Sequence, residues 1–349
     1  MNPYRGILGA VQEMESIWVK GGGWLMYANP QLEKMAPDEL HALQLQRLKK
    51  TVAWAYEKSG IYKRKFDAAG VKPEDIHTLE DIEKLPFTTE REVEEHSAHE
   101  FLTLPFSAIS RVSLWEHPRP LIRMYTARDI ACNVEMMTRA LAAADISRAS
   151  VVGILGDLAD SGLMDTQYAL EVLGTTVVPL GTEYDRAMKL LDATYLSTVV
   201  GSARRVLRLI IQAQAVGREI KEFNLSTILC FNENLQNPLK MHMRNRIGTQ
   251  VYNFFNSSSF GTSGMFYQCK EHVGHHLQED YYYAEIAAFG QDVIVTDPNC
   301  MGELILTSLT TEALPLIRYR TGQTVMRMDQ PCSCGRTFAR FSTPFGAFN

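Results

Sequence analysis

The alternation of short apolar runs with helical patterns between residues 108 and 263 restricts the fold more than any other feature of this sequence. Each apolar run is short enough for a strand, and each stretch between the runs has helical periodicity. Strands and helices that alternate at this spacing predict right-handed crossover connections and a mostly parallel sheet flanked by helices. The predicted strands of this α/β core cover residues 151–155, 176–178, 197–200, 226–230 and 251–255.

The segments on either side of this core have different patterns. Residues 37–59 and 62–69 read as helices within an N-terminal helical section, 1–107. After residue 264 the helical patterns stop, and the chain reads as antiparallel strands of a smaller β subdomain, 264–349. These strands are predicted at 265–269, 282–289, 292–295, 303–307 and 324–328.

Composition excludes several classes of protein. The chain has 349 residues, of which 46% are hydrophobic, and its formal net charge of -5 lacks the basic surplus expected of a protein that binds nucleic acid or an anionic membrane. No run approaches the roughly 20 apolar residues of a membrane span. Glu13 and Glu15 come too early for a signal peptide, so we expect a cytoplasmic protein.

Cysteine spacing predicts a metal site. Six cysteines in a reducing compartment are thiols or metal ligands rather than disulfides. Cys332 and Cys334 share a tight turn, and Cys269 lies upstream with three histidines, His272, His275 and His276. Three cysteines and one histidine would suit tetrahedral Zn²⁺, and four protein ligands leave no open position, which is typical of a structural site. Spacing alone does not choose among the histidines, and buried thiols beside surface histidines are the alternative interpretation.

Polar and aromatic residues at strand ends are candidates for ligand binding. Asp157 and Asp160 lie between a predicted strand and a helix, at the carboxyl end of the sheet, where α/β proteins bind ligands. A helix N-cap is the competing interpretation. Tyr252 and Phe255 are expected to contribute to the core and to one wall of a pocket, with Asn256 beside them.

Two groups of motifs resemble the phenylacetate–CoA ligases of the adenylate-forming superfamily. The first runs from Leu43-Gln44-Leu45-Gln46-Arg47-Leu48 to Leu85-Pro86-Phe87-Thr88-Thr89; the second is Gly302-Glu303-Leu304-Ile305-Leu306-Thr307 through Arg318-Tyr319-Arg320-Thr321-Gly322. The resemblance implies an ancestor that formed an acyl-adenylate from an acid and ATP, from which CoA then displaced AMP. It also implies that the small C-terminal domain with the catalytic lysine is absent, because the chain stops near residue 346. In this register Cys269, His276, Cys332 and Cys334 match the family's cysteine and histidine positions.

The phosphate-binding loop departs from the family pattern. In place of a loop rich in Ser, Thr and Gly, residues 114–120 include Trp115, Glu116 and His117, with prolines and no glycine. A phosphate cradle needs successive N–H groups that point into one hollow, which glycine permits and proline prevents. The charge of Glu116 would repel phosphate by about 4 kcal/mol per unit charge at about 4 Å and an effective dielectric near 20. A tight connection between two strands is the alternative interpretation.

Three further positions depart from the pattern. Ser259 stands where the family has the glutamate that holds Mg²⁺, and a neutral hydroxyl is a poor ligand for that ion. Gln323 replaces the aspartate that binds the ribose hydroxyls. Phe231 replaces a glycine on the adenine side, although Glu233 remains there. We therefore treat these positions, with Arg320, as an altered nucleotide site and expect neither ATP nor Mg²⁺ to bind.

These observations lead to three functional hypotheses. The first is a repurposed ligase homologue that binds an acyl or aryl carboxylate or thioester, with CoA or a carrier protein, and catalyses ATP-independent acyl transfer or condensation. In that case His117 would be a general base with Ser257, Ser258 or Ser259 as its partner, although a solvated loop histidine is the alternative. The second is a non-catalytic partner of a ligase or carrier protein, and the third is an ATP-dependent acid–CoA ligase with an atypical loop. The sequence leaves open whether the chain forms a homodimer.

Overall fold

The predicted parallel sheet is present in the computed structural model, which describes residues 27–115, 120–219, 222–231, 237–255, 257–262 and 264–347. Its strands pair in parallel in the order β4-β3-β5-β6-β7. Their bounds are β3 (Val151–Leu155), β4 (Thr176–Gly181), β5 (Thr198–Gly201), β6 (Thr227–Phe231) and β7 (Gln250–Phe255). The helices of this part are α7 (Ala127–Ala143), α8 (Ser161–Val172), α9 (Tyr184–Ala193), α10 (Ala203–Ala215) and α11 (Asn237–Ile247).

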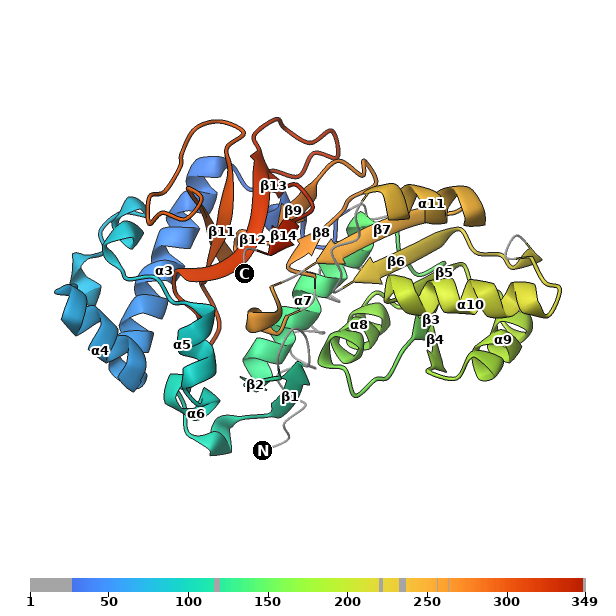
Figure 1. Cartoon of the computed structure of the whole chain (residues 1–349), viewed down its shortest axis with the longest axis horizontal. Helices are drawn as coiled ribbons and strands as arrows, with labels where there is room; N and C mark the ends of the chain where they lie inside the picture. Colours follow the sequence, from blue (N-terminus) through green and yellow to red (C-terminus); the bar gives the residue numbers. More distant parts are fainter. Residues whose placement is uncertain are drawn as a thin grey trace.

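Helices cover both faces of the parallel strands (Figure 1). Successive side chains of a strand point to opposite faces, and β6 follows this rule. Leu229 packs with α7 and α8 on one face, whereas Ile228 and Cys230 pack with α9, α10 and α11 on the other. The strands are therefore apolar on both sides, as expected of a parallel sheet between two helical layers.

The antiparallel strands extend the same sheet. Strand β8 (Phe266–Tyr267) pairs antiparallel with β7, and the order continues through β9, β13, β12, β11 and β10. The bounds are β9 (His275–Leu277), β10 (Tyr282–Ala287), β11 (Met301–Ser308), β12 (Tyr319–Met328), β13 (Arg340–Phe341) and β14 (Phe345–Ala347), which pairs with β12. The predicted β region thus exists, but it is joined edge to edge to the α/β core.

Two details of the strand prediction are corrected. Residues 292–295 do not form a strand; Ile294 makes only an isolated bridge to Ala287. Val293 is apolar but 57% exposed, so the apolar pattern that predicted a strand here did not reflect burial. The short strands β9, β13 and β14 were missed because two or three residues are too few to produce a periodicity.

The N-terminal helices cover the antiparallel part. On α3, Leu48 and Val52 are fully buried and join one core with residues of β10, β11 and β12. Helix α4 ends at Gly70, whose φ of 68° is the left-handed conformation that favours glycine at a helix end. The elements are α2 (Pro30–Glu33), α3 (Pro37–Lys58), α4 (Gly60–Ala69), α5 (Glu90–Glu95) and α6 (Ala98–Phe101), with 3-10 turns η1 (Pro73–Asp75), η2 (Glu80–Lys84) and η3 (Phe106–Ala108).

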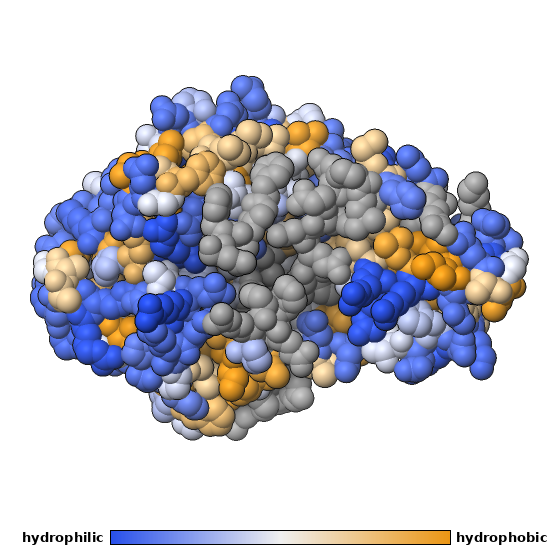
Figure 2. Space-filling model, viewed as in Figure 1, coloured by the Kyte–Doolittle hydropathy of each residue, from blue (hydrophilic) through white to orange (hydrophobic). Residues whose placement is uncertain are grey.

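A separate two-stranded hairpin precedes α7. It consists of β1 (Arg111–Trp115) and β2 (Leu121–Tyr125), which pair antiparallel. Val112, Leu114 and Ile122 are each about half exposed on this hairpin. Figure 2 shows apolar surface at the lower edge of the molecule, near the hairpin and α6. Among the residues that the structure describes, none of the helices combines the length and apolar character needed to cross a membrane.

Candidate functional site

The segment after β7 lies against both β12 and the hairpin. Residues Ser258–Phe260 form the 3-10 turn η5. The Ser259 Oγ lies 2.5 Å from the hydroxyl of Tyr319 in β12, and the Tyr125 hydroxyl of β2 donates to the Gly261 carbonyl at 2.6 Å. These contacts bring β2, η5 and β12 together, although the three segments are far apart in the sequence.

The Ser259 hydroxyl is held by a phenol that keeps its proton. Both residues are buried, and burial raises the pKa of Tyr319 to about 12. A phenol with so high a pKa is a hydrogen-bond donor at neutral pH and a poor acceptor for the serine proton. The structure therefore gives Ser259 an anchor, and the catalytic roles predicted for Ser257, Ser258 and Ser259 stay predictions. Their proposed partner His117 lies outside the described residues.

Two residues of the altered nucleotide site are already engaged in the sheet. Arg320 pairs with Glu303, 3.0 Å from its Nε, and with Asp292 at 2.5 Å. Gln323 lies opposite Ala347 of β14, and its buried Oε1 has no hydrogen-bond partner among the described residues. Trp115 ends β1, and Glu116 and Glu233 lie outside the described residues.

The two aspartates after β3 cap local structure. Asp160 is the N-cap of α8 and accepts the Gly162 N–H at 2.8 Å, so the capping interpretation is confirmed. The Asp157 carboxylate accepts the Ala159 N–H at 2.9 Å. A role of either residue in a pocket stays a prediction.

The predicted aromatic wall packs in the core. The Tyr252 ring lies 4.4 Å from that of His272, and Phe255 stacks on Phe266 at 4.3 Å between ring centroids. Tyr252 and Phe255 are 4% and 1% exposed, so the structure confirms their core role. Asn256, beside them, lies outside the described residues.

A small cavity with a buried arginine was not predicted. It has a volume of 20 Å³ and lies between β2, the start of α7, residues 260–262 and residues 310–311. Arg123 of β2 lines it and is 5% exposed. The available sequence signal was an arginine between Ile122 and Met124 on a short strand, which by itself is also typical of an exposed strand face.

The four predicted metal ligands lie together. The ligand atoms of Cys269, His276, Cys332 and Cys334 are within 4.8 Å of one another, and all four residues are buried. The Sγ atoms of Cys269 and Cys332 are 3.7 Å apart, and Cys334 Sγ is 3.4 Å from His276 Nε2. The structure thus selects His276 and leaves His272 and His275 outside the cluster.

The surroundings of the cluster hold its members in place. His276 donates from Nδ1 to the Phe338 carbonyl at 3.0 Å, which directs Nε2 toward the cysteines. The Tyr27 hydroxyl donates to the Cys334 carbonyl. Hydrogen bonds from Cys269 and then His276 lower the pKa of Cys334, although burial raises it. The cluster therefore combines a thiol that loses its proton more readily than usual with an oriented imidazole.

Comparison with solved structures gives the class of protein. An open conformation of 2-hydroxyisobutyryl-CoA ligase, in complex with 2-HIB-AMP and CoA, superposes with a TM-score of 0.87 at 20% identity, over 94% of this chain and 79% of that chain. The fold is that of the acid–CoA ligases of the adenylate-forming superfamily, as the sequence predicted. No family model matches the chain.

Two curated relatives then narrow the class to a family. The phenylacetate–coenzyme A ligase of Escherichia coli (strain K12) is 30% identical over 315 residues, which are 86% of this chain and 72% of the relative. That of Thermus thermophilus is 28% identical over 330 residues, 92% of this chain and 73% of the relative. The chain belongs to the phenylacetate–CoA ligase family.

Proposed function

We propose that this family member binds an acyl or aryl carboxylate or thioester and does not form an acyl-adenylate from ATP. The observation that carries the proposal is the contact of Ser259 with Tyr319, at the position where the family resemblance expects a magnesium-binding glutamate. A neutral hydroxyl held by a protonated phenol offers no negative charge to a hard divalent cation. Magnesium ATP would therefore lack one of its main anchors.

The ribose position supports the same proposal. Gln323 can offer one amide oxygen, where an aspartate would offer two charged acceptors. That oxygen is buried beside β14 and has no donor among the described residues. Arg320 would not compensate, because Glu303 and Asp292 already pair with its charge.

Binding has more support here than a specific chemical step. Acyl transfer to CoA or to a carrier protein would need a group that accepts a proton, and the described contact of Ser259 is with a hydroxyl of high pKa. We therefore propose a carboxylate- or thioester-binding protein first, with ATP-independent transfer as the reaction class to test.

We also propose that the Cys269, His276, Cys332 and Cys334 cluster holds a structural Zn²⁺. A tetrahedral ion with Zn–S bonds of about 2.3 Å places two sulfurs about 3.8 Å apart, and Cys269 and Cys332 are separated by 3.7 Å. Three thiols and one imidazole are also the ligands that zinc prefers. Because all four positions would be filled by protein, the ion would brace β9 against the turn at 332–335 and take no part in a reaction.

The test compares adenylation with binding. Pyrophosphate release from ATP–Mg²⁺ and phenylacetate is measured for the full chain, with the Escherichia coli relative as a positive control. Thermal shift is measured in parallel with phenylacetate, a phenylacetyl thioester and ATP–Mg²⁺. We expect no acid-dependent release of pyrophosphate. We expect the acid or the thioester to raise the melting temperature, and ATP–Mg²⁺ to leave it unchanged. Acid-dependent pyrophosphate release at a rate near that of the control would refute the proposal.

An ATP-dependent acid–CoA ligase is the second candidate. The names of the curated relatives favour it, since each is a phenylacetate–coenzyme A ligase matched over most of this chain. Pyrophosphate release in the same experiment would establish this candidate in place of the first.

A further inference from the structure

We propose that the cavity beside Arg123 is an anion subsite that receives the carboxylate group of a small acid. The inference rests on the proposed function, because it names the group by which the acid would be held. It assigns that task to a residue of β2 outside the altered phosphate loop.

The guanidinium of Arg123 is buried with only part of its hydrogen-bonding capacity used. Its Nη2 donates to the Leu314 carbonyl at 3.0 Å, and its Nε has no acceptor among the described residues. No carboxylate of the described residues lies within ion-pair distance of it, and burial lowers its pKa. A buried cation without a paired anion is costly, so an anionic ligand in the cavity would recover part of that cost.

The cavity also contains an acidic residue, Asp129, but its oxygens are already satisfied. They accept three backbone N–H groups, from Thr126 at 3.0 Å, Glu312 at 2.8 Å and Ala313 at 3.1 Å. Asp129 forms no ion pair with Arg123 among the described contacts. Three donors already bind the carboxylate of Asp129, whereas the Nε of Arg123 lacks an acceptor among the described residues. The hydrogen-bonding group that the cavity lacks is therefore an acceptor.

The remaining lining suits the end of a carboxylate. Hydroxyl, amide and thiol groups line the space together with the apolar side chains of Met124, Met136 and Phe260. The Tyr282 hydroxyl donates to Thr262 Oγ1 at 3.2 Å. A volume of 20 Å³ exceeds the roughly 10–15 Å³ that one water requires, so the space admits an end group rather than a whole aryl acid. The polar side chains around Arg123 are Asn133, Cys132, Tyr282, Thr262, Thr310 and Thr311.

The cavity lies directly against the altered segment after β7. Phe260 and Thr262 line it, and Gly261 lies between them with a φ of 64°. A Cβ at Gly261 would come within 2.7 Å of Arg123 Cγ and 2.5 Å of the Tyr125 hydroxyl. A glycine at this position therefore lets the segment that carries Ser259 pack closely on the arginine.

The test measures binding of carboxylates to the full chain and to two matched variants. Arg123→Gln removes the buried charge, and Arg128→Gln removes an exposed charge in the first turn of α7, where Arg128 pairs with Glu312. Affinities for acetate, phenylacetate and a neutral phenylacetyl thioester are measured by calorimetry at pH 7. We expect Arg123→Gln to weaken binding of both acids at least about tenfold, because a charge-assisted hydrogen bond is lost. The thioester should change less than about twofold, and Arg128→Gln should match the wild type.

The outcomes separate this inference from the proposed function. Equal phenylacetate affinity in wild type and Arg123→Gln would overturn the subsite and leave the proposed function intact. If neither phenylacetate nor the thioester binds, the proposed function fails, and acetate binding that depends on Arg123 would still support a subsite for free small carboxylates. Should Arg123→Gln not fold, competition on the wild type decides: acetate must displace phenylacetate, and its failure to do so would overturn the subsite.

Discussion

At the scale of single residues, some buried charged side chains titrate, whereas others only hold the structure together. Asp165 on α8 is 1% exposed and accepts hydrogen bonds from Arg111 at 2.5 Å and Asn133 at 3.2 Å. Burial raises its pKa to about 6, although both partners lower it. Desolvation therefore outweighs the ion pair, and the carboxyl takes up a proton far more readily than in the unfolded chain.

We predict that Asp165 makes the protein less stable as pH rises. Its folded pKa of about 6 exceeds the ordinary value of 3.8, so the stabilising contribution is fully present below about pH 4 and is lost as pH rises through 6. The loss is about 3 kcal/mol from this difference. The side chain in Asp165→Asn stays neutral and does not undergo this loss. The free energy of unfolding of the variant, relative to that of the wild type, should therefore rise by about 3 kcal/mol between pH 4 and pH 7.

Urea unfolding at several pH values measures this difference. Asp157→Asn, at an exposed position on the preceding loop, is the control and should follow the wild-type pH profile. Parallel profiles for Asp165→Asn and wild type would show that the Asp165 carboxyl does not titrate in this range.

At the scale of elements, strand pairing assembles the cysteine and histidine cluster. Strand β9 pairs with both β8 and β13, with His276 opposite Tyr267 and Arg340. This brings Cys269, just after β8, near the turn of Cys332 and Cys334, which precedes β13. The segment at 27–34 closes over the turn, since Arg336 pairs with Glu33 at 2.6 Å and Thr337 N–H donates to the Glu33 carbonyl.

We predict that the purified protein carries about one zinc per chain and that Cys334→Ser loses it. Without the ion, three elements lose a shared anchor, and we expect the melting temperature to fall by at least about 5 °C, equivalent to about 2 kcal/mol. Metal analysis and thermal unfolding check both values. Cys300→Ser, at a buried cysteine outside the cluster, should keep its zinc. A wild-type protein free of zinc, with all thiols reactive, would contradict the assignment.

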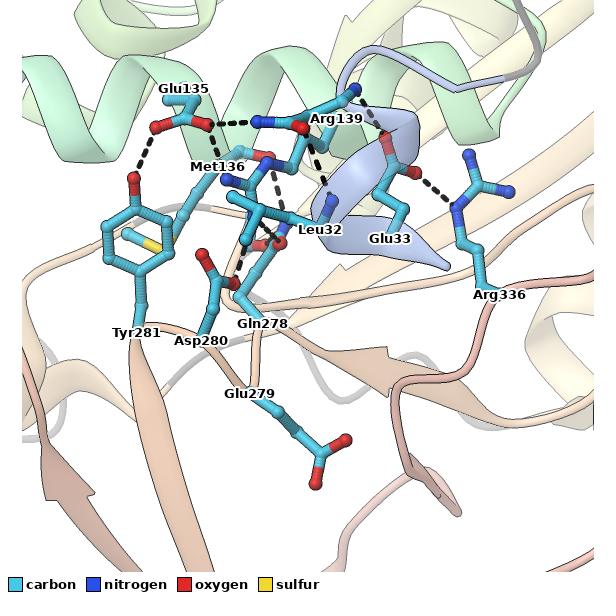
Figure 3. Close-up of polar contacts among 12 residues, drawn as sticks. Leu32, Glu33, Glu135, Met136, Arg139, Gln278, Glu279, Asp280, Tyr281 and Arg336 are labelled. Carbon is cyan, nitrogen blue, oxygen red and sulfur yellow. Dashed lines mark hydrogen bonds and ion pairs between the residues drawn. The ribbon is translucent and has the colours of Figure 1, made fainter. Parts of the chain in front are cut away.

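At the scale of the whole molecule, a buried ionic network joins the three predicted segments (Figure 3). Arg139 of α7 is fully buried and pairs with Asp280 at 2.9 Å and with Glu135. Asp280 lies between β9 and β10, and Arg47 of α3 also approaches it, at 3.6 Å. The helical section, the α/β core and the β region therefore share one set of charges, and they share an apolar core as well.

We predict that Arg139→Met destabilises the protein by about 3–5 kcal/mol, because it leaves the carboxylate of Asp280 buried without its main partner. Arg218→Met, which removes exposed pairs with Asp192 and Glu222, should leave the free energy of unfolding nearly unchanged. Calorimetry should give one unfolding transition for each protein, since the network crosses the predicted boundaries at 107 and 263. Two separated transitions would instead indicate that those segments unfold independently.

Sequence by itself determined the features that depend on neighbouring residues. The apolar run at 151–155 is β3 and the helical pattern at 37–59 is α3, because periodicity follows directly from which face is buried. The cap at Asp160 is equally local, since its side chain reaches an N–H two residues away. The family motifs identified the superfamily fold for the same reason: they are contiguous stretches.

Tertiary structure decided everything that depends on segments meeting across the sheet. Spacing left three histidines as candidate ligands, but neighbouring strand residues point to opposite faces, so β9 turns His276 toward the cysteines and His275 toward Phe255. Likewise, the local sequence around Arg123 does not distinguish an exposed strand from a buried one. Only the packing of α7, residues 260–262 and residues 310–311 around it removes the guanidinium from water.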